Sequence, residues 1–167
     1  MSNQVTINVR DTVAVIAVDN PPVNALSPGV PEALIHAFDA AEQNEAVSAV
    51  VLMGAGRTFI AGADINSLER AAWGDREAAC DMHPLLARIE DCAKPVVMAI
   101  HGTALGGGLE IAMAGHFRVA VPEALVGQPE VNLGIIPGAE GTQRLPRLVG
   151  VAKALGMCGT GKPLKAR

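Results

Sequence analysis

The chain has little of what nucleic-acid-binding and disulfide-rich proteins need. Its 167 residues include no Tyr, one Trp, three Phe and three Cys, and the formal net charge is −4. No basic cluster is long enough to follow a phosphate backbone, and few aromatic rings could stack on bases, so we expect no nucleic-acid partner. The three cysteines show no CxxC spacing, which argues against disulfides and a metal site and favours a reducing compartment.

Long apolar runs are also missing. No segment approaches the ~20 apolar residues that cross a bilayer. The polar start, residues 1–10, has no apolar signal core. We therefore expect a soluble, intracellular protein with no membrane partner.

What the chain does have is a large share of small aliphatic residues. Hydrophobic residues make up 50% of it and charged residues 18%, which excludes a disordered chain. The length fits one domain over residues 1–167, with a core built mainly from Val, Ala, Ile and Leu.

Apolar runs and amphipathic segments alternate along the sequence. We predict strands at 5–9, 12–18, 49–53, 95–100 and 117–121. We predict helices at 31–43, from residue 65, and at 75–91, 109–114, 141–148 and 151–157, with Pro84 poorly placed inside its helix. Alternation of this kind predicts an α/β fold with a mostly parallel sheet covered on both faces.

Two glutamates stand in apolar, glycine-rich surroundings. Glu110 follows the run Gly106-Gly107-Gly108-Leu109, and Glu130 follows Pro129 and precedes an apolar stretch. A carboxylate is costly to bury unless it is hydrogen-bonded or functional, and paired carboxylates in an apolar pocket suit proton transfer. A helix-start charge for Glu110 and a solvated loop acid for Glu130 remain the simpler alternatives.

The glycine run before Glu110 permits two interpretations. It could be a tight turn where no side chain fits, or the start of a helix whose free N–H groups receive an oxyanion. A dinucleotide fingerprint fails, because Ile111 stands where the third glycine belongs. A P-loop at 156–163 fails as well, because Pro163 replaces the hydroxyl residue that binds magnesium.

A second loop that could supply a donor spans residues 59–64. Ala63 has a small side chain, so its N–H can be approached closely, while Asp64 could cap a helix that begins near Ile65. An ordinary capped turn is the alternative. The four histidines are scattered without Ser–His–Asp spacing, so we expect structural or surface roles for them.

Taken together, these segments resemble the enoyl-CoA hydratase/isomerase family, also called the crotonase family. The similarity covers nearly the whole chain, and the sequences of the matching motifs are closest to the hydratase part of multifunctional fatty-acid oxidation enzymes. The matching segments are residues 24–26, 59–65, 104–110, 128–138 and 141–148. The resemblance implies a spiral of repeated ββα units.

The resemblance also implies roles for individual residues. Ala63 and Gly107 would supply the N–H groups of an oxyanion hole for a thioester oxygen. Glu110 would activate the water that adds at the β-carbon, and Glu130 would transfer the proton at the α-carbon. Further contacts to the acyl-CoA would come from Ala25, Leu26, Ala61, Asp64, Ile65, Gly106, Pro129, Pro137 and Gly138.

The activity implied is hydration of a 2-trans-enoyl-CoA in fatty-acid β-oxidation, in a cytoplasmic, bacterial-type enzyme, with peroxisomal and mitochondrial relatives left open. No cofactor is expected, because coenzyme A is part of the substrate. Two alternatives stand beside it: a Δ3-Δ2-enoyl-CoA isomerase using Glu130 alone, and a non-catalytic acyl-CoA-binding chain.

Family members continue beyond the point where this chain stops, at Arg167. The resemblance therefore suggests that C-terminal helices are missing and that the hydratase core is incomplete. In full-length relatives those helices cover the acyl pocket and build a trimer or a dimer of trimers. Multifunctional relatives join the core to a dehydrogenase region instead.

Overall fold

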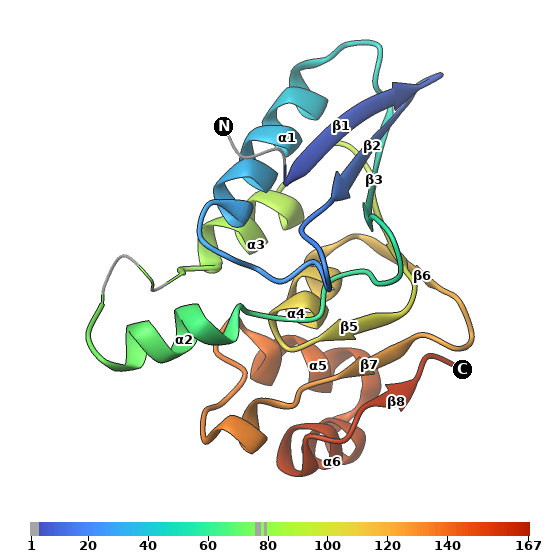
Figure 1. The fold of residues 1–167 in the computed structure, drawn as a ribbon. Helices are drawn as coiled ribbons and strands as arrows, with labels where there is room; N and C mark the ends of the chain where they lie inside the picture. Colours follow the sequence, from blue (N-terminus) through green and yellow to red (C-terminus); the bar gives the residue numbers. More distant parts are fainter. Residues whose placement is uncertain (1–3, 76–77, 79) are drawn as a thin grey trace.

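The computed structural model describes residues 4–75, 78 and 80–167, which form two β-sheets and the helices around them (Figure 1). The larger sheet has the order β1-β2-β3-β4-β6. Its strands are β1 (Val5–Arg10), β2 (Val13–Val18), β3 (Ala49–Gly54), β4 (Val96–Ile100) and β6 (Phe117–Ala120). β1 pairs antiparallel with β2 through a hairpin at Asp11, and the other neighbours are parallel. The five predicted strands are thus confirmed to within a residue at each end.

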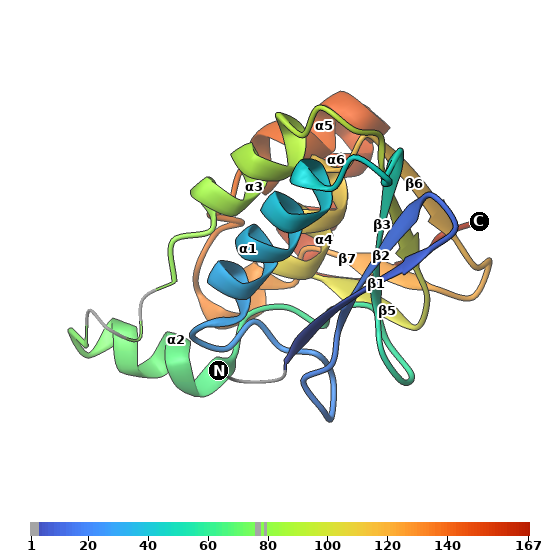
Figure 2. The same cartoon turned by 90° about the horizontal axis from the view of Figure 1, so that it is seen from above.

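Helices cover one face of this sheet. The inward side chains of β2 and β3 are fully buried, among them Ile16 and Leu52, whereas the alternate residues of both strands are only half-buried. α1 (Val30–Gln43) and α3 (His83–Glu90) lie on the buried side, as Figure 2 shows. The prediction of a sheet covered on both faces is wrong for the described residues. The apolar runs in the sequence could not show which face of the sheet is covered by helices and which face stays half-exposed.

The second sheet is small and was not predicted, because its strands are only two or three residues long. It has the order β5-β7-β8, from β5 (Thr103–Leu105), β7 (Leu125–Gly127) and β8 (Leu164–Lys165). Ile60 adds a parallel bridge to Ala104 of β5. Segments that follow β3, β4 and β6 therefore each pass from the first sheet to the second before a helix begins. This repeat is the ββα spiral that the resemblance implied.

Further helical elements surround the end of the second sheet. They are α2 (Ile65–Ala72), α4 (Gly107–Ala114), α5 (Gly141–Val149) and α6 (Val151–Thr160), and a single 3₁₀ turn, η1, spans Glu130–Leu133. α4 lies in the interior, and every residue from Gly108 to Ala114 is buried. Glu110 is therefore placed on the most enclosed helix of the molecule.

The helix predicted at 75–91 is the largest error in the helical prediction. Its second half is helical: α3 begins at His83, so Pro84 stands in the first turn, where the missing N–H of proline breaks no intrahelical hydrogen bond. Residues 76–77 and 79 of that prediction lie outside the described residues. None of the described helices is both long and apolar enough to cross a membrane.

Candidate active site

A cavity of about 560 Å³ opens between α2, the start of α4 and η1. Its wall is mostly apolar, with side chains such as Leu68, Met82 and Ile136. Glu110 and Glu130 both line it, together with Ala63 and Gly107. The spiral thus brings together four residues from three separate segments, which the resemblance had assigned to one site.

Glu110 is almost entirely enclosed. Its residue is 3% exposed, and its Oε1 accepts a hydrogen bond of 2.7 Å from the Gly141 N–H. Burial raises the pKa of this carboxyl to about 7; the Gly141 N–H opposes the rise and the charge of Glu130 adds to it. Near neutral pH, Glu110 can therefore both take up and release a proton.

Glu130 begins η1 and is also buried, at 8% exposure. Burial raises the pKa of its carboxyl. Gln128 is fully buried beside it, and with its amide nitrogen directed at Glu130 it donates to both carboxylate oxygens, at 3.0 and 3.1 Å. The backbone of Gly106 passes so close that a Cβ there would lie 2.9 Å from Glu130 Oε1. Glycine is needed at this position, also because its φ is +52°.

Two backbone N–H groups face the same cavity. Ala63 forms a parallel bridge with Leu26 that uses the Gly62 carbonyl and the Asp64 N–H, so the Ala63 N–H points to the opposite side. Gly107 is the first residue of α4, and its N–H has no acceptor within the helix. An ideal Cβ on Gly107 would lie 4.0 Å from Ala63 N, so the two donors are neighbours.

Most of the other residues expected to contact a ligand also line the cavity. These are Leu26, Ala61, Asp64, Ile65, Gly106, Pro129 and Gly138. Asp64 in addition caps α2, as predicted, by accepting a 2.9 Å bond from the Ser67 N–H. Ala25 and Pro137 are not part of this lining.

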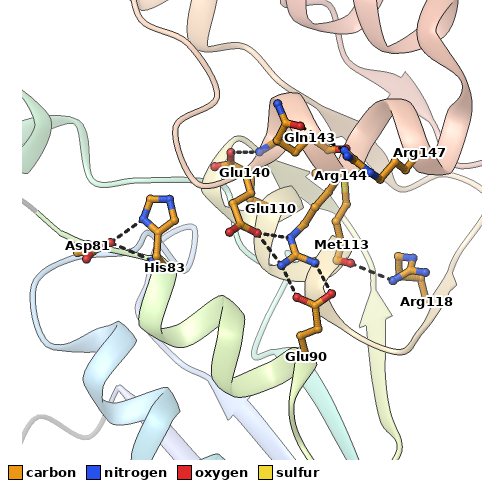
Figure 3. Close-up of polar contacts among 11 residues, drawn as sticks. Asp81, His83, Glu90, Glu110, Met113, Arg118, Glu140, Gln143, Arg144 and Arg147 are labelled. Carbon is orange, nitrogen blue, oxygen red and sulfur yellow. Dashed lines mark hydrogen bonds and ion pairs between the residues drawn. The ribbon is translucent and has the colours of Figure 1, made fainter.

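Several residues at the site escaped the sequence analysis. Gln128 and Gly141 were not singled out, although both lie in segments that carried the family resemblance. His83, expected to be structural or at the surface, lines the cavity and pairs with Asp81 through a 2.7 Å contact (Figure 3). No periodicity in the sequence marks these positions. The Gly141 contact arises only because α5 packs against α4.

The buried charge at Glu110 predicts a pH-dependent change in stability. Its carboxyl has a pKa of 4.5 when unperturbed and about 7 in the fold, so the folded state binds more protons between these values. Stability should therefore fall as pH rises from 4.5 through 7. Glu110→Gln, which keeps an acceptor for Gly141, should raise the free energy of unfolding above pH 7 by up to about 3 kcal/mol.

Denaturant unfolding of the two proteins across this pH range measures the effect. The advantage of the variant should shrink toward zero near pH 4.5, where both side chains are neutral. Glu45→Gln, at an exposed position, is the control and should show no such dependence. If Glu110→Gln is no more stable than wild type at alkaline pH, burying the ionised Glu110 carboxylate does not destabilise the fold.

The arrangement defines a class of site. Two enclosed carboxylates are able to move protons, and two neighbouring backbone N–H groups are able to stabilise an oxygen that gains negative charge. The rest of the wall is mostly apolar, which strengthens electrostatic contacts inside the cavity. This combination suits acid–base chemistry next to a carbonyl group.

Comparison with known proteins agrees with that class. The sequence pattern of the enoyl-CoA hydratase/isomerase family matches residues 8–167. A probable enoyl-CoA hydratase of Bacillus subtilis is 46% identical over 167 residues, covering 99% of this chain and 65% of that protein. The peroxisomal bifunctional enzyme of Danio rerio is 45% identical over 159 residues, covering 95% of this chain and 21% of that protein.

Solved structures show the same relationship. The enoyl-CoA hydratase from Bacillus anthracis superposes with a TM-score of 0.89 at 36% identity, covering 98% of this chain and 65% of that one. The chain belongs to the enoyl-CoA hydratase/isomerase family. It spans 65% of the length of its Bacillus subtilis relative and a smaller share of the multifunctional ones.

Proposed function

We propose that this chain carries the catalytic site of a 2-enoyl-CoA hydratase, which adds water across the conjugated double bond of an acyl-CoA thioester. The observation that supports this most is the enclosure of both Glu110 and Glu130 in the cavity that Ala63 and Gly107 also line. Addition of water needs one group to activate the water and another to supply a proton to the neighbouring carbon. A site with a single carboxylate would not meet both needs.

The steps follow from the geometry. The thioester oxygen lies against the Ala63 and Gly107 N–H groups, which stabilise the negative charge that develops there. Glu110 takes a proton from water as the oxygen bonds to the β-carbon. Glu130 delivers a proton to the α-carbon, giving a 3-hydroxyacyl-CoA. No cofactor enters the reaction, because coenzyme A arrives as part of the substrate.

A second candidate is isomerisation of a 3-enoyl-CoA to the 2-enoyl isomer. It needs only one carboxylate to move a proton between two carbons. Gln128 favours this possibility, because its two contacts with Glu130 stabilise the ionised form of that carboxylate. The same oxyanion site would serve both reactions.

The biological setting is part of the proposal. The Danio rerio relative is named as a peroxisomal bifunctional enzyme, and other relatives as multifunctional proteins of fatty-acid β-oxidation. We assign this chain to the same process, in a cytoplasmic setting. Assembly into a homo-oligomer, or linkage to a dehydrogenase region, belongs to the same proposal.

The pH profile separates the two reactions. Hydration needs one proton on the carboxylate pair, because Glu110 must be ionised while Glu130 is protonated; burial raises the pKa of both carboxyls, that of Glu110 to about 7. We expect kcat/KM for hydration to fall about tenfold per pH unit once this last proton is lost on the alkaline side, and again at low pH when a second proton binds. Isomerisation needs Glu130 ionised and should level off on the alkaline side.

The measurement follows the ultraviolet absorbance of the conjugated thioester, which hydration removes and isomerisation creates. Rates are recorded between about pH 5 and 9 with a 2-enoyl-CoA and with a 3-enoyl-CoA. A hydration rate that continues to rise with pH would show that the doubly ionised pair is the active form. The proposed division of roles would then be wrong.

A further inference from the structure

The Gly141 N–H that binds Glu110 depends on an unusual backbone conformation of the preceding residue. Glu140 has φ +66° and ψ 10°, in the left-handed region, and caps the start of α5 with its carbonyl oxygen. This conformation is unfavourable for a residue that carries a Cβ. The peptide between Glu140 and Gly141 turns with it, so a return to the right-handed region would direct the N–H away from Glu110. Something must therefore hold Glu140 in place.

Arg144 is the group that holds it. Its Nε donates to Glu140 Oε2 at 2.8 Å, and its Nη2 lies 2.6 Å from the same oxygen. The other side of the guanidinium makes two bonds to Glu90 at the end of α3, at 3.1 and 2.7 Å. The Arg144 side chain is only 15% exposed, which strengthens these contacts compared with those of a solvated ion pair.

The contacts form a continuous path to the carboxylate. It runs from Glu90 on α3 through Arg144 to Glu140, and from the Glu140 peptide through the Gly141 N–H to Glu110 on α4 (Figure 3). The other charged groups that act on Glu110 are Glu130 from η1 and His83 from α3. No contact joins Arg144 to Glu110 directly among the described residues.

We propose that Arg144 is a positioning residue, which fixes the Glu140–Gly141 peptide between α3 and α5 so that its N–H holds Glu110 in the orientation that activates water. The inference rests on the proposed hydratase function. It assigns Arg144 no contact with substrate and no proton transfer. Replacing Arg144 should therefore lower kcat and change the ionisation of Glu110, and it should leave substrate affinity unchanged.

The test compares Arg144→Met with Arg144→Lys and with Arg147→Met as control. Arg147 lies on the same helix and is exposed, and among the described residues its side chain hydrogen-bonds to Gln143. In Arg144→Met we expect kcat for hydration to fall by about 10- to 100-fold with KM within about twofold. The pKa of Glu110, followed by NMR of ¹³C-labelled glutamate side chains, should rise by about one unit, because a hydrogen bond to the charged form is lost. Arg144→Lys should keep part of the wild-type kcat and show a smaller rise in the Glu110 pKa. Arg147→Met should change neither quantity.

A second variant covers the possibility that Arg144→Met fails to fold. Glu140→Ala removes the carboxylate that Arg144 holds but keeps a Cβ, so the left-handed conformation stays unfavourable and Arg144 no longer holds it in place. It should shift the Glu110 pKa and kcat in the same direction. If either folded variant titrates Glu110 as wild type does and keeps its kcat, the inference is overturned.

The two proposals fail in different ways. If wild type does not hydrate a 2-enoyl-CoA but the Glu110 pKa still rises in Arg144→Met, the hydratase assignment fails and the positioning role stands. If wild type is active and the variants leave both quantities unchanged, the positioning role fails alone.

Discussion

Replacing Glu130 with glutamine will lower kcat for hydration of a 2-enoyl-CoA by about 10²- to 10⁴-fold, the range expected for loss of an acid–base group. Glutamine keeps the size of the side chain but cannot deliver a proton to the α-carbon. The change leaves Ala63 and Gly107 in place, so KM should stay within a few-fold of wild type.

The matched variant Glu110→Gln should reduce hydration by a similar factor but spare isomerisation of a 3-enoyl-CoA. The reason is that Glu130 alone can move a proton between two carbons, while water has no base without Glu110. Glu130→Gln should abolish both reactions. Loss of isomerisation in Glu110→Gln would show that the two carboxylates cannot be assigned separate roles. Combined with its expected gain in stability, Glu110→Gln would be a variant that is more stable and less active.

Gly141→Ala is the second change with a large expected effect. A Cβ at this position would lie 2.6 Å from Glu110 Oε1, 2.6 Å from the Gln128 amide and 2.7 Å from the Pro137 Cβ. These distances are too short for any side chain, so α5 or Glu110 must shift. Displacing a catalytic group by about 1 Å can cost 10²-fold in rate, and overpacking a buried site costs about 1–3 kcal/mol. We therefore expect Gly141→Ala to lose both catalytic rate and stability.

Gly156→Ala is the control for that experiment. It places the same methyl group inside α6, where nothing lies within 4 Å of the new Cβ. Alanine should raise helix stability there by up to about 1 kcal/mol and leave kcat unchanged. Thermal unfolding and steady-state hydration rates on both variants make the comparison. A Gly141→Ala protein with wild-type melting temperature and kcat would show that the Gly141–Glu110 contact is not needed.

The sequence predicted the regular elements well where apolar patterns were long. The strands at β2, β3 and β4 and the helix α1 follow directly from runs of buried side chains such as Ile16, Leu52 and Phe38. The start of α3 was misplaced because residues 75–91 carry helical periodicity on both sides of Pro84. The second sheet was missed because β5, β7 and β8 are too short to show alternation.

The residues of the candidate site likewise include some that the sequence could predict and some that it could not. Glu110 and Glu130 could be predicted because a carboxylate within apolar sequence is unusual, and the family resemblance supplied Ala63 and Gly107. Gly141 and Arg144 could not, because their contacts with Glu110 and Glu90 join separate turns of the spiral. Gln128 could not either, because nothing in the sequence shows that its amide faces Glu130 two residues away. Arg144 in particular looks in the sequence like any exposed helical arginine, although its guanidinium joins two elements next to Glu110.

The central claim is that Glu110 and Glu130 together add water to a 2-enoyl-CoA. Its most direct test is to incubate the chain with a 2-trans-enoyl-CoA in ¹⁸O-labelled water and measure labelled 3-hydroxyacyl-CoA by mass spectrometry. We predict one ¹⁸O atom in the hydroxyl group of the product formed by wild type, and a rate at least about 10²-fold lower in both Glu110→Gln and Glu130→Gln. Labelled product that forms at the wild-type rate in both variants, or no labelled product from wild type, would contradict the account.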